Sequence, residues 1–415
     1  MSSASIAVLP ALALLLAGSP RERIGRGLEL WKAGEHESAW SEFQAALETD
    51  PRSAEAWYQA GRLLAEQKRH ESAVFHLEKA VALEPGEPAY RLALGIARSE
   101  NQEYEQAREI LRQLIAGRPQ FVEAHFNLGT VYARQGRHKE AVESYATVLR
   151  LEPGNDQARL SLAQAYQAVG QVREAIPLLE QYVARQPADP QGHYWLGRAL
   201  RHLSQPAGAA AALGRAVEIA PDDYEIRYNL GFVLDQTGRH GEALAHLRRA
   251  CELHPRAAEL RYLLWKVLRA LGKTPAAAEE LQAFQLLKRL EDDRLAAAAL
   301  HMKADEAVKS GSTAAAAELF RQAKELDPED PKLHYNLGRA LGQMGDARGH
   351  ALHLRRAIEL DPNLVSAHYD LALAALREGR LDEAERGFKT ALAIEPRFAD
   401  AQANLGTLYA RQAKP

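Results

Sequence analysis

The stretch HFNLGTVYARQGRHKEAVESYATVLRLEPGN, residues 125–155, decides the fold, because its pattern recurs along the chain. Apolar residues follow helical spacing on both sides of Gly136, which predicts two helices joined by a turn. Glycine suits such a turn because it adopts a positive φ without strain. Pro153 then ends the second helix, since proline cannot continue a helix. The stretch therefore predicts one helical hairpin.

Columns of residues repeat with a period of 34, which identifies internal repeats. The prolines are Pro51, Pro85, Pro119, Pro153, Pro187, Pro221, Pro255, Pro328, Pro362 and Pro396. Small residues recur at Gly27, Gly61, Gly95, Gly129, Ala163, Gly197, Gly231, Ala304, Gly338, Ala372 and Gly406, which we call the small column. An alanine column includes Ala73, Ala141 and Ala384. A hairpin buries its apolar stripe only against a neighbour, so we predict an all-α solenoid of about eleven hairpins plus a terminal helix.

The pattern resembles the tetratricopeptide repeat, W-x2-L-G-x2-Y…A-x3-F…P. It is present as Trp57…Gly61…Ala73…Leu77…Pro85, as Leu128-Gly129…Tyr132…Ala141…Tyr145…Pro153, and as Ala384…Phe388…Pro396. The resemblance covers almost everything after residue 20. It implies a right-handed superhelix whose first helices line a concave groove that binds a protein or peptide.

Departures from the pattern divide the array. Trp265 occupies the small column, and we expect it to separate its two helices or to bulge outward. His350 replaces an alanine, which predicts a looser hairpin. Five extra residues precede the next repeat, and 276–310 holds neither glycine nor proline, so we expect one extended helix or two abutting ones. We predict a repeat block at 20–290, a junction at 291–296 and a second block at 297–415. A neutral insertion within one longer helix is the alternative.

The N-terminal residues 1–19 need a separate interpretation. Residues 6–17 form an apolar segment of signal-peptide length. No lysine or arginine precedes it, whereas Arg21 and Arg23 follow it, which is the wrong side for export by charge. We expect export, with an N-terminal extension as the alternative.

Composition excludes several classes of function. The net charge is −3 without a basic run, so non-specific nucleic-acid binding lacks its driving force. No apolar stretch is long enough to span a membrane. Cys251 is the only cysteine, and we expect it to be a buried structural residue. No catalytic motif is present, and His350 with His353 forms only a weak pair for a metal, so we predict no enzyme activity, no cofactor and no metal.

Aromatic and basic residues cluster near the small column of the middle repeats. Because rings offer rigid contact area and arginines bind carboxylates in a fork, we predict a groove for an acidic peptide. The alternative is that the rings are repeat-consensus residues without a ligand. The predicted groove residues are Phe126, Asn127, Tyr194, Arg198, Arg201, Tyr228, Asn229, Phe232, Tyr262, Lys266 and Arg269.

Two columns beside these residues carry amides and imidazoles. Asparagines at 127, 229, 336 and 404 match the ladder with which the O-linked N-acetylglucosamine transferase repeats grip a peptide, but other repeats, including Trp195, break it. Histidines at 125, 193, 334 and 368 are interpreted as packing residues rather than metal ligands. The lysine clamp of chaperone-tail-binding repeats is missing.

These observations predict a non-enzymatic scaffold that binds a protein or peptide. The alternative is a targeting subunit of a separately encoded enzyme, such as a glycosyltransferase or a cell-envelope assembly complex. An enzyme with a scattered site in the groove is a third option. Self-association through the terminal helix also stays open.

Overall fold

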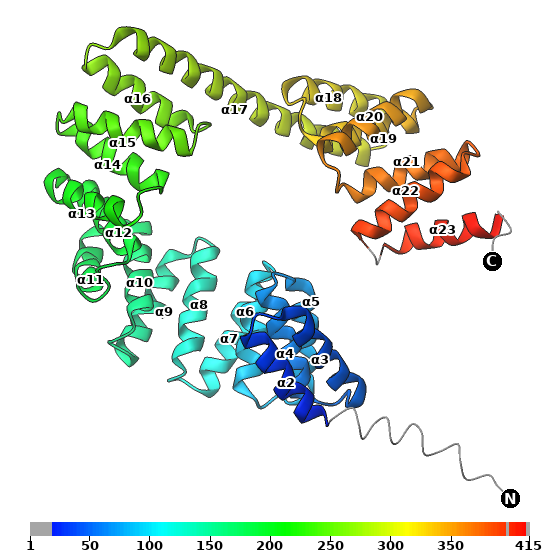
Figure 1. Cartoon of the computed structure of the whole chain (residues 1–415), viewed down its shortest axis with the longest axis horizontal. Helices are drawn as coiled ribbons and strands as arrows, with labels where there is room; N and C mark the ends of the chain where they lie inside the picture. Colours follow the sequence, from blue (N-terminus) through cyan, green and yellow to red (C-terminus); the bar gives the residue numbers. More distant parts are fainter. Residues whose placement is uncertain (1–18, 396–397, 412–415) are drawn as a thin grey trace, which may run out of the picture. The chain divides into compact units, whose positions relative to one another are not determined.

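The computed structural model describes residues 19–395 and 398–411, and every regular element in these ranges is a helix. The apolar segment predicted before residue 19 lies outside the described residues. The chain forms two compact units, one up to Pro255 and one from Arg256 onward. Within each unit, helices pack against their neighbours in chain order (Figure 1). The predicted all-α solenoid is confirmed, whereas its handedness and its exact repeat count stay predictions.

The first unit contains seven hairpins among its described residues. Its helices are α2 (Pro20–Lys32), α3 (His36–Thr49), α4 (Ala54–Glu66), α5 (His70–Leu83), α6 (Pro88–Glu100), α7 (Tyr104–Gly117), α8 (Val122–Arg134), α9 (His138–Leu151), α10 (Asp156–Ala168), α11 (Val172–Arg185), α12 (Pro190–His202), α13 (Pro206–Ile219), α14 (Tyr224–Gln236) and α15 (His240–Leu253). Even-numbered helices are the first helices of their hairpins.

The second unit repeats the scheme around one long helix. Its helices are α16 (Ala258–Ala270), α17 (Thr274–Lys309), α18 (Thr313–Leu326), α19 (Pro331–Gln343), α20 (Ala347–Leu360), α21 (Val365–Arg377), α22 (Leu381–Ile394) and α23 (Ala399–Arg411). Here α16, α19 and α21 are first helices, and so is the C-terminal part of α17.

In several repeats a polar residue two positions after the repeat proline caps the next first helix. The side chains of Ser53, Asn155 and Asp223 each accept the backbone N–H of the residue three positions later. Such a cap contributes about 1 kcal/mol, since it satisfies an N–H that has no partner inside the helix. The proline and the polar residue after it therefore end one hairpin and start the next.

The residue four positions before the small column forms a hydrogen bond that stabilises the connection between two hairpins. Its side chain donates to the carbonyl oxygen of the repeat proline six residues earlier, as in Trp57 to Pro51 (3.0 Å) and His125 to Pro119 (2.9 Å). The same bond recurs at His193, His334 and His368. These histidines are structural, as the sequence predicted.

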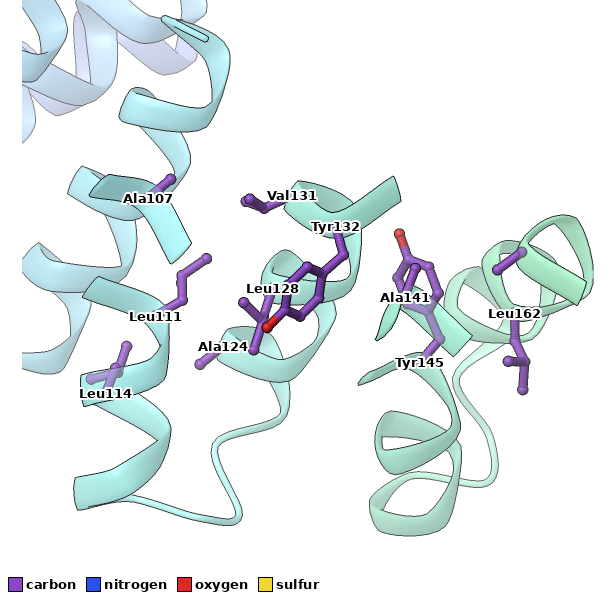
Figure 2. Packing of buried hydrophobic residues seen from close by; sticks show 11 residues of the cluster. Ala107, Leu111, Leu114, Ala124, Leu128, Val131, Tyr132, Ala141, Tyr145 and Leu162 are labelled. Carbon is purple, nitrogen blue, oxygen red and sulfur yellow. The ribbon is translucent and has the colours of Figure 1, made fainter. Parts of the chain in front are cut away.

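The small column exists because a large side chain of the second helix lies against it. A Cβ atom added at Gly129 would lie 2.7 Å from Cε1 of Tyr145, and one at Gly197 would lie 2.5 Å from Cγ of Leu213. Figure 2 shows the resulting core, which runs without a break from Leu111 on α7 through Leu128 on α8 and Tyr145 on α9 to Leu162 on α10. Each hairpin thus shares its interior with the next.

The hairpin turns need a left-handed residue. Gly34, Gly136 and the six other glycines of this column have φ between 70° and 86°. Lys68, Gln102 and Ser204 adopt the same conformation, with φ of 57° to 62°, although they are not glycines. The requirement for positive φ predicted from the glycine column is therefore confirmed, and three repeats meet it with a strained residue.

The predicted junction at 291–296 lies inside α17, a single helix of 36 residues. No residue between 276 and 310 interrupts it, so of the two predicted forms the structure has the extended helix. Its N-terminal part pairs with α16 and its C-terminal part with α18. Leu286, Leu290 and Leu295 are exposed between these two pairings. The division into blocks 20–290 and 297–415 stays a prediction.

Candidate binding site

Hydrogen bonds one repeat apart link the first helices on the face that carries the predicted groove residues. The hydroxyl of Tyr90 donates to Glu55 (2.9 Å), and that of Tyr335 donates to Asp370 (3.1 Å). Each pair is separated by 35 residues. A residue on this face therefore finds its partner about one period away, so equivalent positions in different repeats can be compared directly.

Two arginines of α12 lie over aromatic rings. The guanidinium carbon of Arg198 is 4.6 Å from the ring centroid of Trp195 and 5.5 Å from that of Tyr194. That of Arg201 is 5.0 Å from the ring centroid of Phe232 on α14. Stacking of this kind restrains a guanidinium and leaves its N–H edge available for an acceptor.

These arginines share a cavity of about 290 Å³. It is lined by Gln164, Gln167, Ala168, Val172, Trp195, Arg198, Arg201 and His202. Within the described residues, neither arginine has a carboxylate oxygen within 4.0 Å. Burial, and then the charge of Arg198, lowers the pKa of Arg201. The cavity thus holds two positive charges, partly removed from water and without a counter-charge.

Tyr194 is a buried residue that packs beneath Arg198. Its side chain is only 6% exposed, and its hydroxyl donates to Glu225 of the next first helix (3.3 Å). Burial raises its pKa. Arg198 lies over its ring and the neighbouring repeat accepts its hydroxyl, so direct contact of Tyr194 with a ligand stays a prediction.

The other predicted residues of the first unit flank the cavity or lie apart from it. Tyr228 and Phe232 on α14 are half-buried with ring centroids 6.4 Å apart. Asn229 is buried, and its amide donates to the Glu225 carbonyl (2.8 Å). Phe126 and Asn127 on α8 do not line the cavity. Asn127 likewise donates to its own helix, at the Glu123 carbonyl (2.7 Å).

Tyr262, Lys266 and Arg269 belong to α16 in the second unit, where they form a smaller cluster. Tyr262 is 46% exposed, and its ring centroid lies 5.2 Å from those of both Trp265 and Phe284. The guanidinium of Arg269 is 5.4 Å from the Trp265 ring. Trp265 thus packs within this cluster, and α16 and α17 still form a hairpin.

A repeat of the second unit shows what neutralises such an arginine. Arg339 follows Gly338 of the small column, as Arg198 follows Gly197. Its Nε lies 3.7 Å from the carboxylate of Asp370, one repeat further on. The residue equivalent to Asp370 after Arg198 is Asn229, which carries no charge. At this position Arg339 has a carboxylate within 4.0 Å, whereas Arg198 has a neutral amide.

Sequence reasoning missed the other walls of the cavity, which are Trp195, His202 and the amides of Gln164 and Gln167. Trp195 was seen only as a break in the asparagine ladder. A usable signal was present, since its indole precedes Arg198 by three residues on a helix and so shares a face with it.

The remaining ionisable clusters do not converge on a metal. His350 and His353 point to different partners: the Nδ1 of His350 bonds the Gly338 carbonyl (2.8 Å), whereas that of His353 meets Nδ1 of His334 (3.1 Å). Across residues 19–395 and 398–411, no three histidine, cysteine or carboxylate side chains gather as a metal site would require. Cys251 is buried, as predicted.

No described helix combines the length and apolar character that crossing a membrane would need.

Stacked helical hairpins with a common 34-residue period define the chain as an α-solenoid. Tetratricopeptide repeat models match residues 132–199, 200–250, 228–289, 304–345, 331–364 and 353–386. The chain belongs to the tetratricopeptide repeat family. The model for the cytochrome c-type biogenesis protein H TPR domain matches residues 43–159.

Solved structures of similar fold include other proteins of this kind. A tetratricopeptide repeat protein from Parabacteroides merdae ATCC 43184 is 16% identical, with 60% of this chain and 98% of that chain covered and a TM-score of 0.48. MamA of AMB-1 is 27% identical, with 40% and 99% covered and a TM-score of 0.38. No curated protein matches the sequence. The family and the fold make this chain a protein-interaction scaffold, a class that is typically non-enzymatic.

Proposed function

We propose that this scaffold holds an acidic peptide segment of its partner on the first-helix face of the first unit, anchored at Arg198 and Arg201. The observation that carries the proposal is that both arginines line one cavity without a carboxylate counter-ion. A protein seldom keeps two such charges partly desolvated and unpaired, since their burial is unfavourable. An acidic side chain would supply the missing charge.

The contacts available suit this role. A carboxylate accepts two parallel N–H bonds from a guanidinium, and hydrogen bonds to charged groups contribute about 1.5–3 kcal/mol each. The Trp195 indole supplies apolar contact area beside the anchor. Because the hairpins are already ordered, the scaffold loses little conformational entropy on binding. Tyr228, Asn229 and Phe232 extend the proposed contact along α14, and Phe126 and Asn127 are proposed to bind a more distant part of the segment.

The cluster of Tyr262, Lys266 and Arg269 is a separate proposed contact in the second unit. Its exposed tyrosine and its arginine stacked on Trp265 offer the same chemistry as the first-unit cavity on a smaller scale. Only the first-unit cavity is proposed as the anchor.

The test is affinity capture of partners from native lysate by the full chain and by the double variant Arg198→Glu with Arg201→Glu. We expect the variant to lose the partner while its circular dichroism stays helical. The matched control reverses two exposed second-helix arginines, Arg112→Glu with Arg248→Glu, which changes the net charge equally. Equal recovery by the two double variants would refute the anchor.

A second candidate function follows from the match to the cytochrome c-type biogenesis protein H TPR domain. On this match we propose that the chain is a scaffold subunit of a cell-envelope assembly complex for c-type cytochromes. Deleting the gene and staining proteins for covalently attached haem tests this directly. Loss of haem-bearing cytochromes would support the assignment, and an unchanged haem pattern would reject it.

A further inference from the structure

We propose that the cavity lined by α10, α11 and α12 takes a phosphomonoester group, so that the partner segment is a phosphorylated peptide. This rests on the proposed function and narrows it. The argument depends on the number of charges in the cavity, on the donors that line it and on the space that they enclose.

The charge count favours a dianion. Arg198 and Arg201 contribute two positive charges, and none of the eight lining residues is acidic. A single carboxylate would leave one guanidinium uncompensated in a partly buried site. A phosphate monoester carries a charge of about −1.5 to −2 at pH 7 and offers three acceptor oxygens. One phosphate group can therefore balance the positive charges of both arginines.

The donors match three oxygens rather than two. Each guanidinium presents its edge because its face lies on a ring: Arg198 on Trp195 and Arg201 on Phe232. Opposite them, α10 supplies two side-chain amides. One N–H of Gln167 donates to the Trp195 carbonyl (3.2 Å), so this amide keeps a second N–H, and Gln164 adds another amide to the cavity lining.

The volume of this half-open cavity accommodates a phosphate group together with the side chain that carries it. At about 290 Å³ the cavity is roughly ten times the volume of one water in the liquid. That is room for a phosphate and the short side chain that bears it. The equivalent arginine of the second unit, Arg339, is already neutralised by Asp370, so the preference is expected only in the first unit.

The experiment uses the full chain labelled with 5-fluorotryptophan and observed by ¹⁹F NMR. Its five tryptophans include Trp195 in the cavity and Trp265 beneath Arg269. The Trp195→Phe variant assigns the first resonance. The probes are three capped pentapeptides, Ala-Ala-X-Ala-Ala, in which X is phosphoserine, glutamate or serine. We expect the phosphoserine peptide to shift the Trp195 resonance at a concentration at least tenfold below the glutamate peptide, without moving Trp265.

Variants tie that shift to the cavity. Arg198→Gln with Arg201→Gln should abolish it, whereas Arg112→Gln with Arg248→Gln, at two exposed second-helix arginines, should leave it unchanged, and the melting midpoint of each variant checks folding. Arg198→Gln alone serves if the double variant is unstable, and it should weaken the response.

Each contrary result has its own meaning. Equal response to phosphoserine and glutamate would overturn the phosphate preference and leave the acidic anchor standing. No Trp195 shift with either peptide would overturn both proposals. A shift that survives the double variant would show that the ligand binds elsewhere.

Discussion

Two repeats with the same local pattern, Gly197-Arg198 on α12 and Gly338-Arg339 on α19, differ in how they treat their arginine. Arg339 lies 3.7 Å from Asp370, which also accepts the Tyr335 hydroxyl (3.1 Å). Arg198 lies on Trp195, and the residue equivalent to Asp370 is the neutral Asn229. The first repeat is left with an unbalanced charge, and the second is internally balanced.

The comparison teaches that a repeat array keeps its architecture while exchanging the function of single positions. The backbone positions, the tyrosine–acid bond to the next repeat and the small glycine are common to both repeats. Only residues one period apart decide whether a given arginine stabilises the fold or stays available for a ligand. Binding sites in such arrays are therefore found by examining pairs of positions across neighbouring repeats.

The largest expected effect is a difference in stability between alanine substitutions at Gly197 and at Gly338. A Cβ at Gly197 would lie 2.5 Å from Cγ of Leu213, whereas at Gly338 the nearest atom, the His350 carbonyl oxygen, is 3.2 Å away. Gly197→Ala should lower stability by about 1–3 kcal/mol, since overpacking must move the second helix. Gly338→Ala should change it by less than about 1 kcal/mol, because better helix propensity offsets a small shift. Urea unfolding followed by circular dichroism measures both, and equal midpoints would contradict the packing argument.

Exchanging the residues that set the charge should exchange the behaviour of the two repeats. Asn229→Asp places a carboxylate where Asp370 stands relative to Arg339 and should weaken binding of an acidic peptide about tenfold, or about 1.4 kcal/mol. Asp370→Asn removes the counter-ion of Arg339 and should let the second unit bind the same peptide weakly. Titration calorimetry with both variants measures the exchange.

The control for this exchange is Asn229→Leu, which removes the same amide without adding charge. If charge is responsible, its peptide affinity should fall clearly less than that of Asn229→Asp, because only the proposed contact of the amide is lost. An affinity loss equal to that of Asn229→Asp would assign the effect to the lost Glu225 hydrogen bond instead.

Acidification should lower the local stability of the second-unit hairpin α19–α20 and leave that of the first-unit hairpin α12–α13 unchanged. His334 donates through Nε2 to the Pro328 carbonyl (3.1 Å), so in the neutral form of both rings its Nδ1 accepts the N–H of His353 Nδ1 (3.1 Å). Burial lowers the pKa of both, and Lys324, Arg321 and Arg356 outweigh Asp330 and Asp346 around them. Because the folded pKa values lie below the ordinary 6.5, the unfolded chain binds more protons, and stability is lost as pH falls below 6.5.

Hydrogen exchange of peptides from α19 and α20, compared with α12 and α13, measures this at pH 7.5 and 5.5. Opening free energies derived after correction for intrinsic exchange should fall only in the second pair of helices. His353→Gln should remove much of the difference. A pH-independent opening of α19 and α20 would refute the histidine account.

The smallest expected effect concerns the turns. Lys68 holds φ of 59° where other repeats have glycine. Lys68→Gly should relieve left-handed strain, but the unfolded chain gains entropy from glycine. The net gain in stability should be roughly a few tenths of a kcal/mol. Gly136→Lys should cost about 1 kcal/mol by the reverse argument. Thermal midpoints of the two variants that shift in the same direction would contradict it.

Most of the fold was predictable because period-34 columns each have a local physical cause. Gly136 predicted the turn and Pro153 the helix end, and the absence of helix breakers between 276 and 310 predicted one extended helix or two abutting ones, of which the structure has the first. The hydrogen bond made by the histidine column could not be predicted from the sequence. The bond from His125 to the Pro119 carbonyl depends on how the chain folds back over six residues, which spacing alone does not show.

The candidate site was predictable only in part. The arginines were identified by composition on one helix face, but Tyr194 and Tyr262 of the same column differ, at 6% and 46% exposure. The column cannot reveal this, because burial depends on the neighbouring repeat, and the insertion after 289 changes that neighbour for Tyr262. Gln164 and Gln167 enter the cavity from another hairpin, which only the stacking geometry reveals.

The most direct test of the central claim is to ask which of the two repeats touches the partner. A photo-cross-linking residue is placed at Ala168, which lines the first-unit cavity, and separately at Lys309, the position that precedes Arg339 by the same 30 residues. We predict that Ala168 alone captures the partner, and that mass spectrometry of the cross-linked segment finds acidic or phosphorylated residues. Capture from Lys309 alone, or of a segment without negative charge, would contradict the account.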